Sequence, residues 1–375
     1  MQNIQMVDLR AQFLGIESEI RDAIDEVLKT TSFINGPAVK NFAENLGAYL
    51  GVKKVIPCAN GTDALQIALM ALDLKPGDEV IVPSFTYVST AEVIALLGLK
   101  PIMIDVDPDH FCMTAQQFES AISPRTRAVV PVHLYGQCAP MEEIIALAQQ
   151  HDISIIEDNA QAIGSDYYFS DGSVKKSGTI GDIGCTSFYP SKNLGAYGDG
   201  GAMMCNDTAL GETLWKIANH GQSVRYFHDI VGCNSRLDSI QAAILNVKLK
   251  YLDHYCARRR AAADFYDQNL AAIGKIKTPS KVPYSSHVYH QYTLRILDGR
   301  RDQLAEYLKS VNIPTMIYYP LPLQDQKAFK HLYDKRPELP VTESLCKQVI
   351  SLPMHPDLTN DQLEYIVDKI CQFFR

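Results

Sequence analysis

The feature that most constrains the fold is an alternation of short apolar runs with amphipathic stretches in the first half of the chain. The apolar runs fall at residues 55–58, 80–83, 101–106, 128–135 and 153–158. Helical patterns lie between them, at residues 64–72, 89–98, 114–122 and 140–151. Runs that are apolar throughout are typical of parallel strands covered on both faces. We therefore predict an α/β fold with a mostly parallel central sheet between layers of helices.

The pattern changes towards the C-terminus. A long helix is predicted from about residue 235 to about 272, with Arg258, Arg259 and Arg260 on its solvated face. The aromatic and histidine-rich segment before it, from residue 222, is predicted to be a loop. A strand at 292–296 and helices at 301–311 and 360–373 then suggest a smaller α+β unit. We predict a large domain over residues 1–250, including two N-terminal helices, and a small domain over 251–375.

Composition excludes several classes of protein. The 375 residues carry a net charge of −8 without a basic block, which argues against binding nucleic acid. No apolar run is long enough to cross a membrane, and the first residues do not resemble a secretory signal. The nine cysteines are scattered without a CxxC pair, which argues against a disulfide or metal framework and favours a reducing compartment. We expect a cytoplasmic protein without a metal.

A single lysine, Lys192, stands in a stretch of small and turn-forming residues at 184–201. Four glycines follow it closely, at positions 195, 198, 200 and 201. Such a stretch makes a poor helix or strand but can hold a side chain in a fixed pose. A lysine in a partly dry site loses proton affinity and becomes a nucleophilic amine. On this pattern alone, the alternative is that Lys192 is one solvated surface lysine among many.

An apolar run that ends at Asn60-Gly61-Thr62 leads directly into a helical pattern. Asn60 or Thr62 is predicted to cap this helix. Free backbone N–H groups at a helix N-terminus bind anions, and small residues let a phosphate approach them. The alternative is a plain capped helix. The stretch is not a Walker A loop, because no GxxxxGK[ST] is present.

Three polar or aromatic residues, Tyr87, His133 and Asp158, lie at or near the ends of predicted strands. Ligands of parallel sheets gather at the carboxyl ends of the strands. An aspartate that closes an apolar strand needs a cation or hydrogen bonds if it is buried. The alternative for Asp158 is a helix N-cap. Gln161 follows three residues later, close enough to face the same space.

Pyridoxal phosphate requires a positioned lysine, an anion-binding helix N-terminus, an aspartate at a strand end and an aromatic ring. We call the helix N-terminus at residues 60–62 the anion cup. Ser187 lies near the lysine in the sequence. The sequence resembles the DegT/StrS-type nucleotide-sugar aminotransferases, which have the type I (aspartate aminotransferase-like) fold. The resemblance covers nearly the whole chain and rests on residues 60–64, 83–90, 157–161, 187–195, 198–201 and 234–238. Residues 58–66, 220–222 and 351–356 resemble most those members that aminate UDP-N-acetyl-3-keto-glucuronic acid.

The resemblance implies roles for the cofactor-binding residues. Lys192 would hold pyridoxal 5'-phosphate and move the proton during the reaction. Asp158 would pair with the ring nitrogen, Gln161 would contact the ring hydroxyl, and Tyr87 would stack on the ring. The phosphate would be bound by Gly61, Thr62, Ser187 and, from a neighbouring subunit, Asn234. The last role implies a homodimer with shared active sites.

The resemblance also implies substrate contacts, at His220, Arg225, Arg236, Tyr318 and Tyr319. A guanidinium suits a sugar carboxylate or a nucleotide phosphate, although both arginines could instead form surface ion pairs. Tyr318 stands where many relatives have a histidine near the substrate, so we expect the sugar contacts to differ there.

The predicted reaction is transamination of a keto nucleotide sugar with L-glutamate as donor. The predicted product is a 3-amino sugar for lipopolysaccharide or other surface polysaccharide synthesis. One alternative is an aminotransferase for a dTDP-3-keto- or 4-keto-6-deoxyhexose. A related sugar 3-dehydratase is disfavoured, since those relatives have histidine in place of Lys192. A non-catalytic sugar-sensing regulatory protein is disfavoured by the complete set of cofactor residues.

Overall fold

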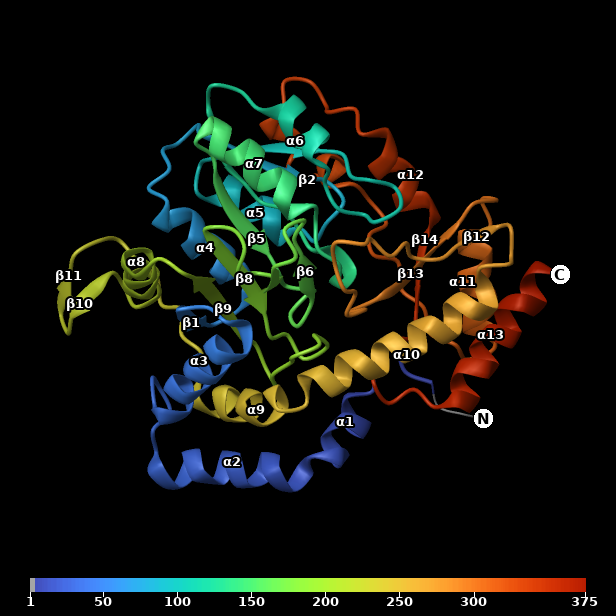
Figure 1. The fold of residues 1–375 in the computed structure, drawn as a ribbon, viewed down its shortest axis with the longest axis horizontal. Coiled ribbons are helices and arrows are strands. Elements are labelled where there is room, and N and C mark those ends of the chain that lie inside the picture. Colours follow the sequence, from blue (N-terminus) through green and yellow to red (C-terminus); the bar gives the residue numbers. More distant parts are fainter. Residues whose placement is uncertain (1–3) are drawn as a thin grey trace.

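The computed structural model describes residues 4–375 and is built on a seven-stranded sheet (Figure 1). The strands lie in the order β1-β9-β8-β5-β4-β2-β3. Their bounds are Lys54–Cys58 (β1), Glu79–Pro83 (β2), Lys100–Ile104 (β3), Thr126–Val129 (β4), Ser154–Asp158 (β5), Ile183–Ser187 (β8) and Gly201–Cys205 (β9). Only β9 runs against its neighbours β1 and β8, so the prediction of a mostly parallel sheet is confirmed.

Helices cover both faces of this sheet because its strands carry apolar side chains on both sides. On β2, Val80 and Val82 join one core while Ile81 joins the other. The first core is closed by α4 (Gly61–Ala71), α5 (Ser89–Leu96) and α8 (Thr208–Ala218). The second is closed by α6 (Ala115–Ala121) and α7 (Met141–His151).

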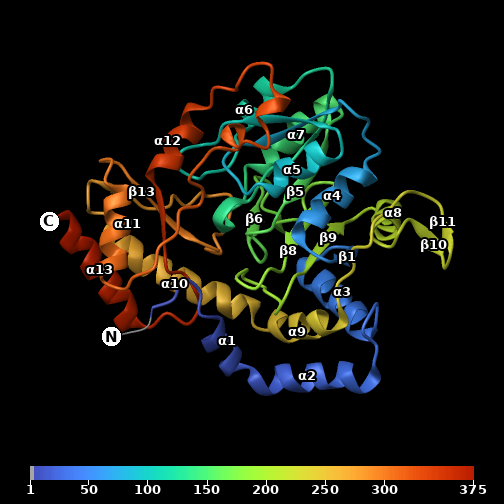
Figure 2. The same ribbon diagram turned by 180° about the vertical axis from the view of Figure 1, so that it is seen from behind.

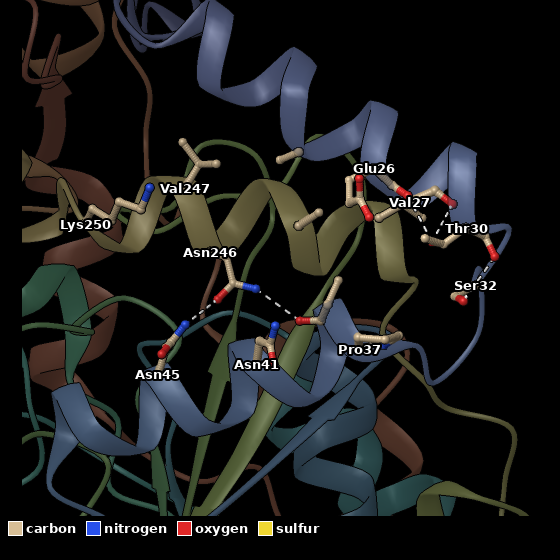
Figure 3. A pocket seen from close by; sticks show the side chains of 13 residues that line it. Glu26, Val27, Thr30, Ser32, Pro37, Asn41, Asn45, Asn246, Val247 and Lys250 are labelled. Carbon is tan, nitrogen blue, oxygen red and sulfur yellow. Dashed lines mark hydrogen bonds between the residues drawn. The ribbon is translucent and has the colours of Figure 1, made fainter.

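The N-terminal helices α2 (Glu17–Thr30) and α3 (Pro37–Leu50) pack beside α9 (Ser239–Leu249), and α1 (Leu9–Gly15) contacts α2. Ile20 of α2 is buried against Ile244 and Val247 of α9. A hollow of about 460 Å³ remains between α2, α3 and α9 (Figure 3). Across it, Asn45 Nδ2 donates a hydrogen bond of 2.9 Å to Asn246 Oδ1.

The C-terminal part has a core of its own. Its antiparallel sheet contains β12 (Ile276–Lys277), β13 (Tyr292–Ile296) and β14 (Val349–Leu352). Helices α10 (Leu252–Leu270), α11 (Arg301–Ser310) and α13 (Asn360–Phe374) pack on it. The chain between α11 and β14 packs against the large sheet. Leu323 and Phe329 join one core of that sheet, and α12 (Pro340–Gln348) joins the other. The division at residue 250 therefore stays a prediction.

Small elements complete the chain. They are β6 (Asp166–Tyr168), β7 (Val174–Lys176), and the 3₁₀ turns Leu134–Gly136, Leu323–Asp325 and Lys330–Leu332. No helix within residues 4–375 is long and apolar enough to cross a membrane.

Three local predictions were wrong. The long helix is two helices, α9 and α10, that meet at Lys250 and Tyr251. The aromatic segment is a hairpin, β10 (Gln222–Val224) and β11 (Phe227–His228), which extends outward beyond α8 in both views (Figures 1 and 2). Arg259 is buried, with only 2% of its surface exposed, because the face of α10 that carries it packs inward.

Candidate active site

A pocket of about 860 Å³ opens where the loops after β1, β2, β5 and β8 converge. This is the edge at which parallel sheets bind ligands. The predicted site residues that line it are Gly61, Thr62, Tyr87, Asp158, Gln161, Ser187, Lys192, Tyr318 and Tyr319. The sheet thus brings together side chains that are far apart in the sequence.

Lys192 lies in the loop that joins β8 to β9. Its backbone N–H donates a hydrogen bond of 2.8 Å to the Tyr189 carbonyl, and Asn193 Nδ2 donates one of 2.9 Å to the Val288 carbonyl. Burial lowers the pKa of the Lys192 amine to about 8, although the Asp158 carboxylate opposes that shift. A lysine with this pKa has a substantial neutral fraction near neutral pH and can act as nucleophile or base.

Asp158 ends β5 with only 5% of its surface exposed. Its Oδ2 accepts a hydrogen bond of 2.8 Å from Thr90 Oγ1, and its Oδ1 accepts one of 3.2 Å from the Ala160 N–H. The chain after Asp158 forms a turn, so the alternative of a helix N-cap is not what the structure has. No ion pair to Asp158 forms within residues 4–375, which leaves a buried carboxylate able to receive a cationic group in the pocket.

The anion cup lies at the N-terminus of α4. The Asn60 side chain caps this helix by accepting a hydrogen bond of 2.8 Å from the Asp63 N–H. Gly61 begins the helix so close to β8 that an added Cβ would lie 2.7 Å from Ser187 Cβ. The absence of a side chain at Gly61 therefore keeps the helix terminus open beside Ser187.

Aromatic rings and an amide also line the pocket. Tyr87 is 56% exposed, and its ring centroid lies 6.3 Å from that of Tyr319. Gln161 Oε1 accepts a hydrogen bond of 2.7 Å from the Tyr135 N–H, and Gln161 Nε2 donates one of 3.2 Å to the Tyr319 hydroxyl. Gln161 and Tyr319 are thus fixed relative to each other, with Tyr318 beside them.

Four predicted site residues lie outside the pocket of their own chain: His220, Arg225, Asn234 and Arg236. Arg225 sits on the hairpin, with its guanidinium 5.1 Å from the Tyr226 ring centroid. His220 and Asn234 are exposed near the base of that hairpin. Within residues 4–375, neither arginine takes part in an ion pair, so the alternative of surface ion pairs is not seen.

Comparison with known proteins gives the family of the chain. Residues 15–371 match the model of the DegT/DnrJ/EryC1/StrS aminotransferase family. The chain belongs to this family. It is 45% identical over 363 residues to the UDP-2-acetamido-2-deoxy-3-oxo-D-glucuronate aminotransferase of Pseudomonas aeruginosa, covering 97% of this chain and 98% of the relative.

Two further relatives are similar over almost their full lengths. One is the "pleiotropic regulatory protein" of Geobacillus stearothermophilus, 44% identical over 375 residues, with 100% of this chain and 99% of the relative covered. The other is a crystal structure of a DegT DnrJ EryC1 StrS aminotransferase from Brucella abortus, with a TM-score of 0.94, 42% identity, and 99% of each chain covered.

Several residues that line this aminotransferase pocket were not predicted from the sequence, among them Tyr189, Asp199, His290 and Gln291. His290 lines the pocket, but no pattern in the sequence connects it with the lysine loop. His133, expected at a strand end, is buried away from the pocket and lies 2.8 Å from Glu157. Burial raises the pKa of Glu157, but hydrogen bonds from His133 and backbone N–H groups outweigh burial and lower it overall. That pair stabilises the fold next to the site.

Proposed function

We propose that this protein transfers an amino group from L-glutamate to a keto group of a nucleotide-linked sugar, with pyridoxal 5'-phosphate as cofactor. The observation that carries the proposal is that Lys192, whose pKa is lowered to about 8, and the buried carboxylate of Asp158 line the same pocket. Membership of an aminotransferase family supports the same reaction type.

The residues present fit the cofactor. The open terminus of α4 at Gly61 and Thr62, with Ser187 beside it, suits a phosphate, and Asp158 suits a protonated ring nitrogen. Tyr87 lines the pocket with a partly exposed aromatic ring. When bound, pyridoxal phosphate supplies an aldehyde to which amines attach and a ring that accepts an electron pair.

The protein's own part in the chemistry is acid–base work by Lys192. In its neutral form, the Nζ atom can remove the proton from the carbon that bears the amino group of the donor. The resulting ammonium then holds that proton in the pocket until it is returned. A pKa of about 8 suits both directions of this transfer, since neither form of the amine is rare near neutral pH.

We propose UDP-N-acetyl-3-keto-glucuronic acid as the sugar substrate. The similarity to the Pseudomonas aeruginosa enzyme supports this choice. The carboxylate of this sugar requires a cationic partner, and within residues 4–375 the pocket is lined by one lysine, Lys192, and by no arginine. Arg225 and Arg236 of a second copy would supply the missing charge.

A nucleotide-linked neutral sugar is the second candidate. It is favoured because, among the described residues, the pocket offers no cation besides Lys192 to pair with a sugar carboxylate. A dTDP-3-keto- or 4-keto-6-deoxyhexose needs no partner for a carboxylate. Incubating the enzyme with L-glutamate and 3-keto or 4-keto nucleotide sugars, with and without the carboxylate, separates the two. We expect turnover of the uronic acid to fall at least tenfold in Arg236→Ala, with little change for a neutral analogue.

The test of the cofactor assignment is the Lys192→Ala variant, with the exposed Lys29→Ala of α2 as matched control. Wild type and the control should bind pyridoxal phosphate with a yellow colour that L-glutamate bleaches. Lys192→Ala should lack both the colour of the lysine-bound cofactor and the turnover. Colour that persists in Lys192→Ala would exclude the assignment. A wild-type protein that never responds to amino donors would favour a non-catalytic regulatory role, in line with the name of the Geobacillus relative, "pleiotropic regulatory protein".

We further propose a homodimer that acts in the cytoplasm, in surface polysaccharide or lipopolysaccharide synthesis. The projecting hairpin supports the dimer, since Val224, Tyr226 and Phe227 expose apolar surface on it. All nine cysteines are free thiols, which supports a reducing compartment.

A further inference from the structure

Thr90 is a buried polar residue that contacts a pocket group without lining the pocket itself. It lies in the first turn of α5, with 1% of its surface exposed. Its Oγ1 donates a hydrogen bond of 2.8 Å to Asp158 Oδ2. Within residues 4–375, the pocket lining includes Ser89 but not Thr90. Thr90 can therefore act on a molecule in the pocket only through the Asp158 carboxylate.

The Thr90 hydroxyl is the donor in this contact, because an ionised carboxylate has no proton to give. A threonine in a helix can instead donate to the carbonyl four residues before it. Here the hydroxyl reaches a strand end that lies 68 residues further along the chain. Hydrogen bonds to an ionised acceptor are stronger than those between neutral groups. The contact thus stabilises the ionised carboxylate of Asp158.

The main chain of Asp158 is fixed independently of its carboxylate. Its N–H donates a hydrogen bond of 2.9 Å to the Pro131 carbonyl, and its carbonyl accepts one of 3.1 Å from the His133 N–H. Only rotation about the side-chain bonds remains to be restricted. Thr90 holds Oδ2, and the Ala160 N–H, at 3.2 Å, holds Oδ1. The orientation of the carboxylate therefore depends on two contacts, of which Thr90 makes the shorter.

Thr90 is fixed in turn by the segment between β2 and α5. At the start of this segment, the Ser84 N–H donates a hydrogen bond of 2.9 Å to the Ile104 carbonyl. Directly after Thr90, Ala91 is buried in the core that α4 and α5 close. The same segment carries Tyr87, three residues before Thr90. An aromatic ring of the pocket and the support of the carboxylate thus come from one short stretch.

We propose that Thr90 is a positioning residue whose hydroxyl keeps the Asp158 carboxylate ionised and in a fixed orientation for the ring nitrogen of pyridoxal 5'-phosphate. This role rests on the proposed function, which assigns Asp158 to that nitrogen. A carboxylate that is already fixed loses little rotational freedom when the cofactor binds. Without the hydroxyl, Oδ2 would be a buried oxygen that has lost its donor, and the carboxylate would turn towards another one.

The test compares the affinities of cofactor-free protein for two cofactors, measured by fluorescence titration. One is pyridoxal 5'-phosphate. The other is 1-deazapyridoxal 5'-phosphate, in which a C–H group replaces the ring nitrogen. Both have the aldehyde and the phosphate, but only the first can pair with Asp158 through a protonated ring nitrogen. We expect the wild type to prefer pyridoxal phosphate at least tenfold.

Thr90→Val has almost the same shape as the wild type but lacks the hydroxyl. We expect this variant to bind pyridoxal phosphate about tenfold more weakly, while its affinity for the deaza analogue changes less than about twofold. Thr90→Ser keeps the hydroxyl and should recover most of the preference. Should Thr90→Val not fold, Thr90→Ala also lacks the hydroxyl and carries the same expectation.

Thr342→Val is the matched control. Thr342 is fully buried as well, and its Oγ1 donates a hydrogen bond of 2.6 Å to Asp105 Oδ1. This contact joins α12 to the residue after β3, and within residues 4–375 neither partner lines the pocket. The variant removes the same kind of hydrogen bond from the same kind of site. Its affinity for either cofactor should change less than about twofold.

Three results would overturn the role of Thr90. Thr90→Val could keep the wild-type preference, it could weaken binding of both cofactors equally, or Thr342→Val could lower the preference as much. Failure of the proposed function looks different, because the wild type itself would then bind neither cofactor or bind both with equal affinity. In that case Asp158 does not pair with the ring nitrogen, and the role of Thr90 is overturned with that assignment.

Discussion

At the scale of single residues, the most unusual side chain outside the pocket is Arg259. It is fully buried in α10, and its Nη1 donates hydrogen bonds to the carbonyls of Tyr289, His290 and Met354, at 3.1, 3.3 and 2.9 Å. The cation therefore joins the segment at 289–290 to the chain that follows β14. Burial lowers the pKa of this guanidinium to about 10, which leaves it charged at neutral pH.

Arg259→Met should lower the free energy of unfolding by about 3 kcal/mol, because three buried carbonyls lose a charged donor. Arg260→Met, on the next and more exposed position, should change it by less than about 0.5 kcal/mol. Urea unfolding followed by circular dichroism measures both. Equal losses in the two variants would show that the buried hydrogen bonds contribute nothing specific.

At the scale of elements, the junction between β1 and α4 determines whether an anion can approach. Asn60 fixes the start of the helix, and Gly61 lies against Ser187 of β8. A methyl group at position 61 would either press on β8 or fill the cup.

Gly61→Ala should therefore weaken binding of pyridoxal phosphate at least tenfold, or about 1.4 kcal/mol, while the protein still folds. Gly15→Ala is the control, since a Cβ there would meet no atom within 4 Å. Fluorescence titration of the cofactor gives both affinities. An unchanged affinity in Gly61→Ala would place the phosphate elsewhere.

Elements were predictable where residues that are neighbours in the chain determine them. They were not predictable where contacts between distant parts of the chain determine them. The strand that ends at Asp158 and the helix capped by Asn60 follow from apolar runs and polar ends that adjoin them in the chain. The burial of Arg259 depends on which face of α10 packs inward, and three consecutive arginines do not reveal it. His290 lines the pocket on a segment that contacts the lysine loop through the hydrogen bond from Asn193 to the Val288 carbonyl, and this contact joins parts far apart in the sequence.

At the scale of the whole molecule, the predicted cofactor and substrate residues fall into two groups. Lys192, Asp158 and the cup share one pocket, whereas Asn234, Arg225 and Arg236 lie outside it. If the second group completes the pocket of a second copy, each active site needs both chains.

Mixed dimers test this arrangement. Lys192→Ala and Asn234→Ala, each inactive alone, should regain about a quarter of wild-type activity after subunit exchange, because half of the dimers are mixed and each has one intact site. The control is a mixture of Lys192→Ala and Asp158→Ala, which should stay inactive. Lys192 and Asp158 of the same chain line the same pocket, so each pocket of a mixed dimer still lacks one of the two residues. No recovery in the first mixture, with exchange shown by mass spectrometry, would mean that the sites are not shared.

The position of β9 has a consequence for how the protein is synthesised. Gly201 on this strand lies opposite both Cys58 of β1 and Ser187 of β8, so β9 joins the two walls of the phosphate cup. The ribosome synthesises the chain from its N-terminus. The residues of β1 and α4 therefore leave the ribosome long before residues 201–205 have been translated. The nascent chain therefore cannot capture the cofactor until more than half of its 375 residues have been translated.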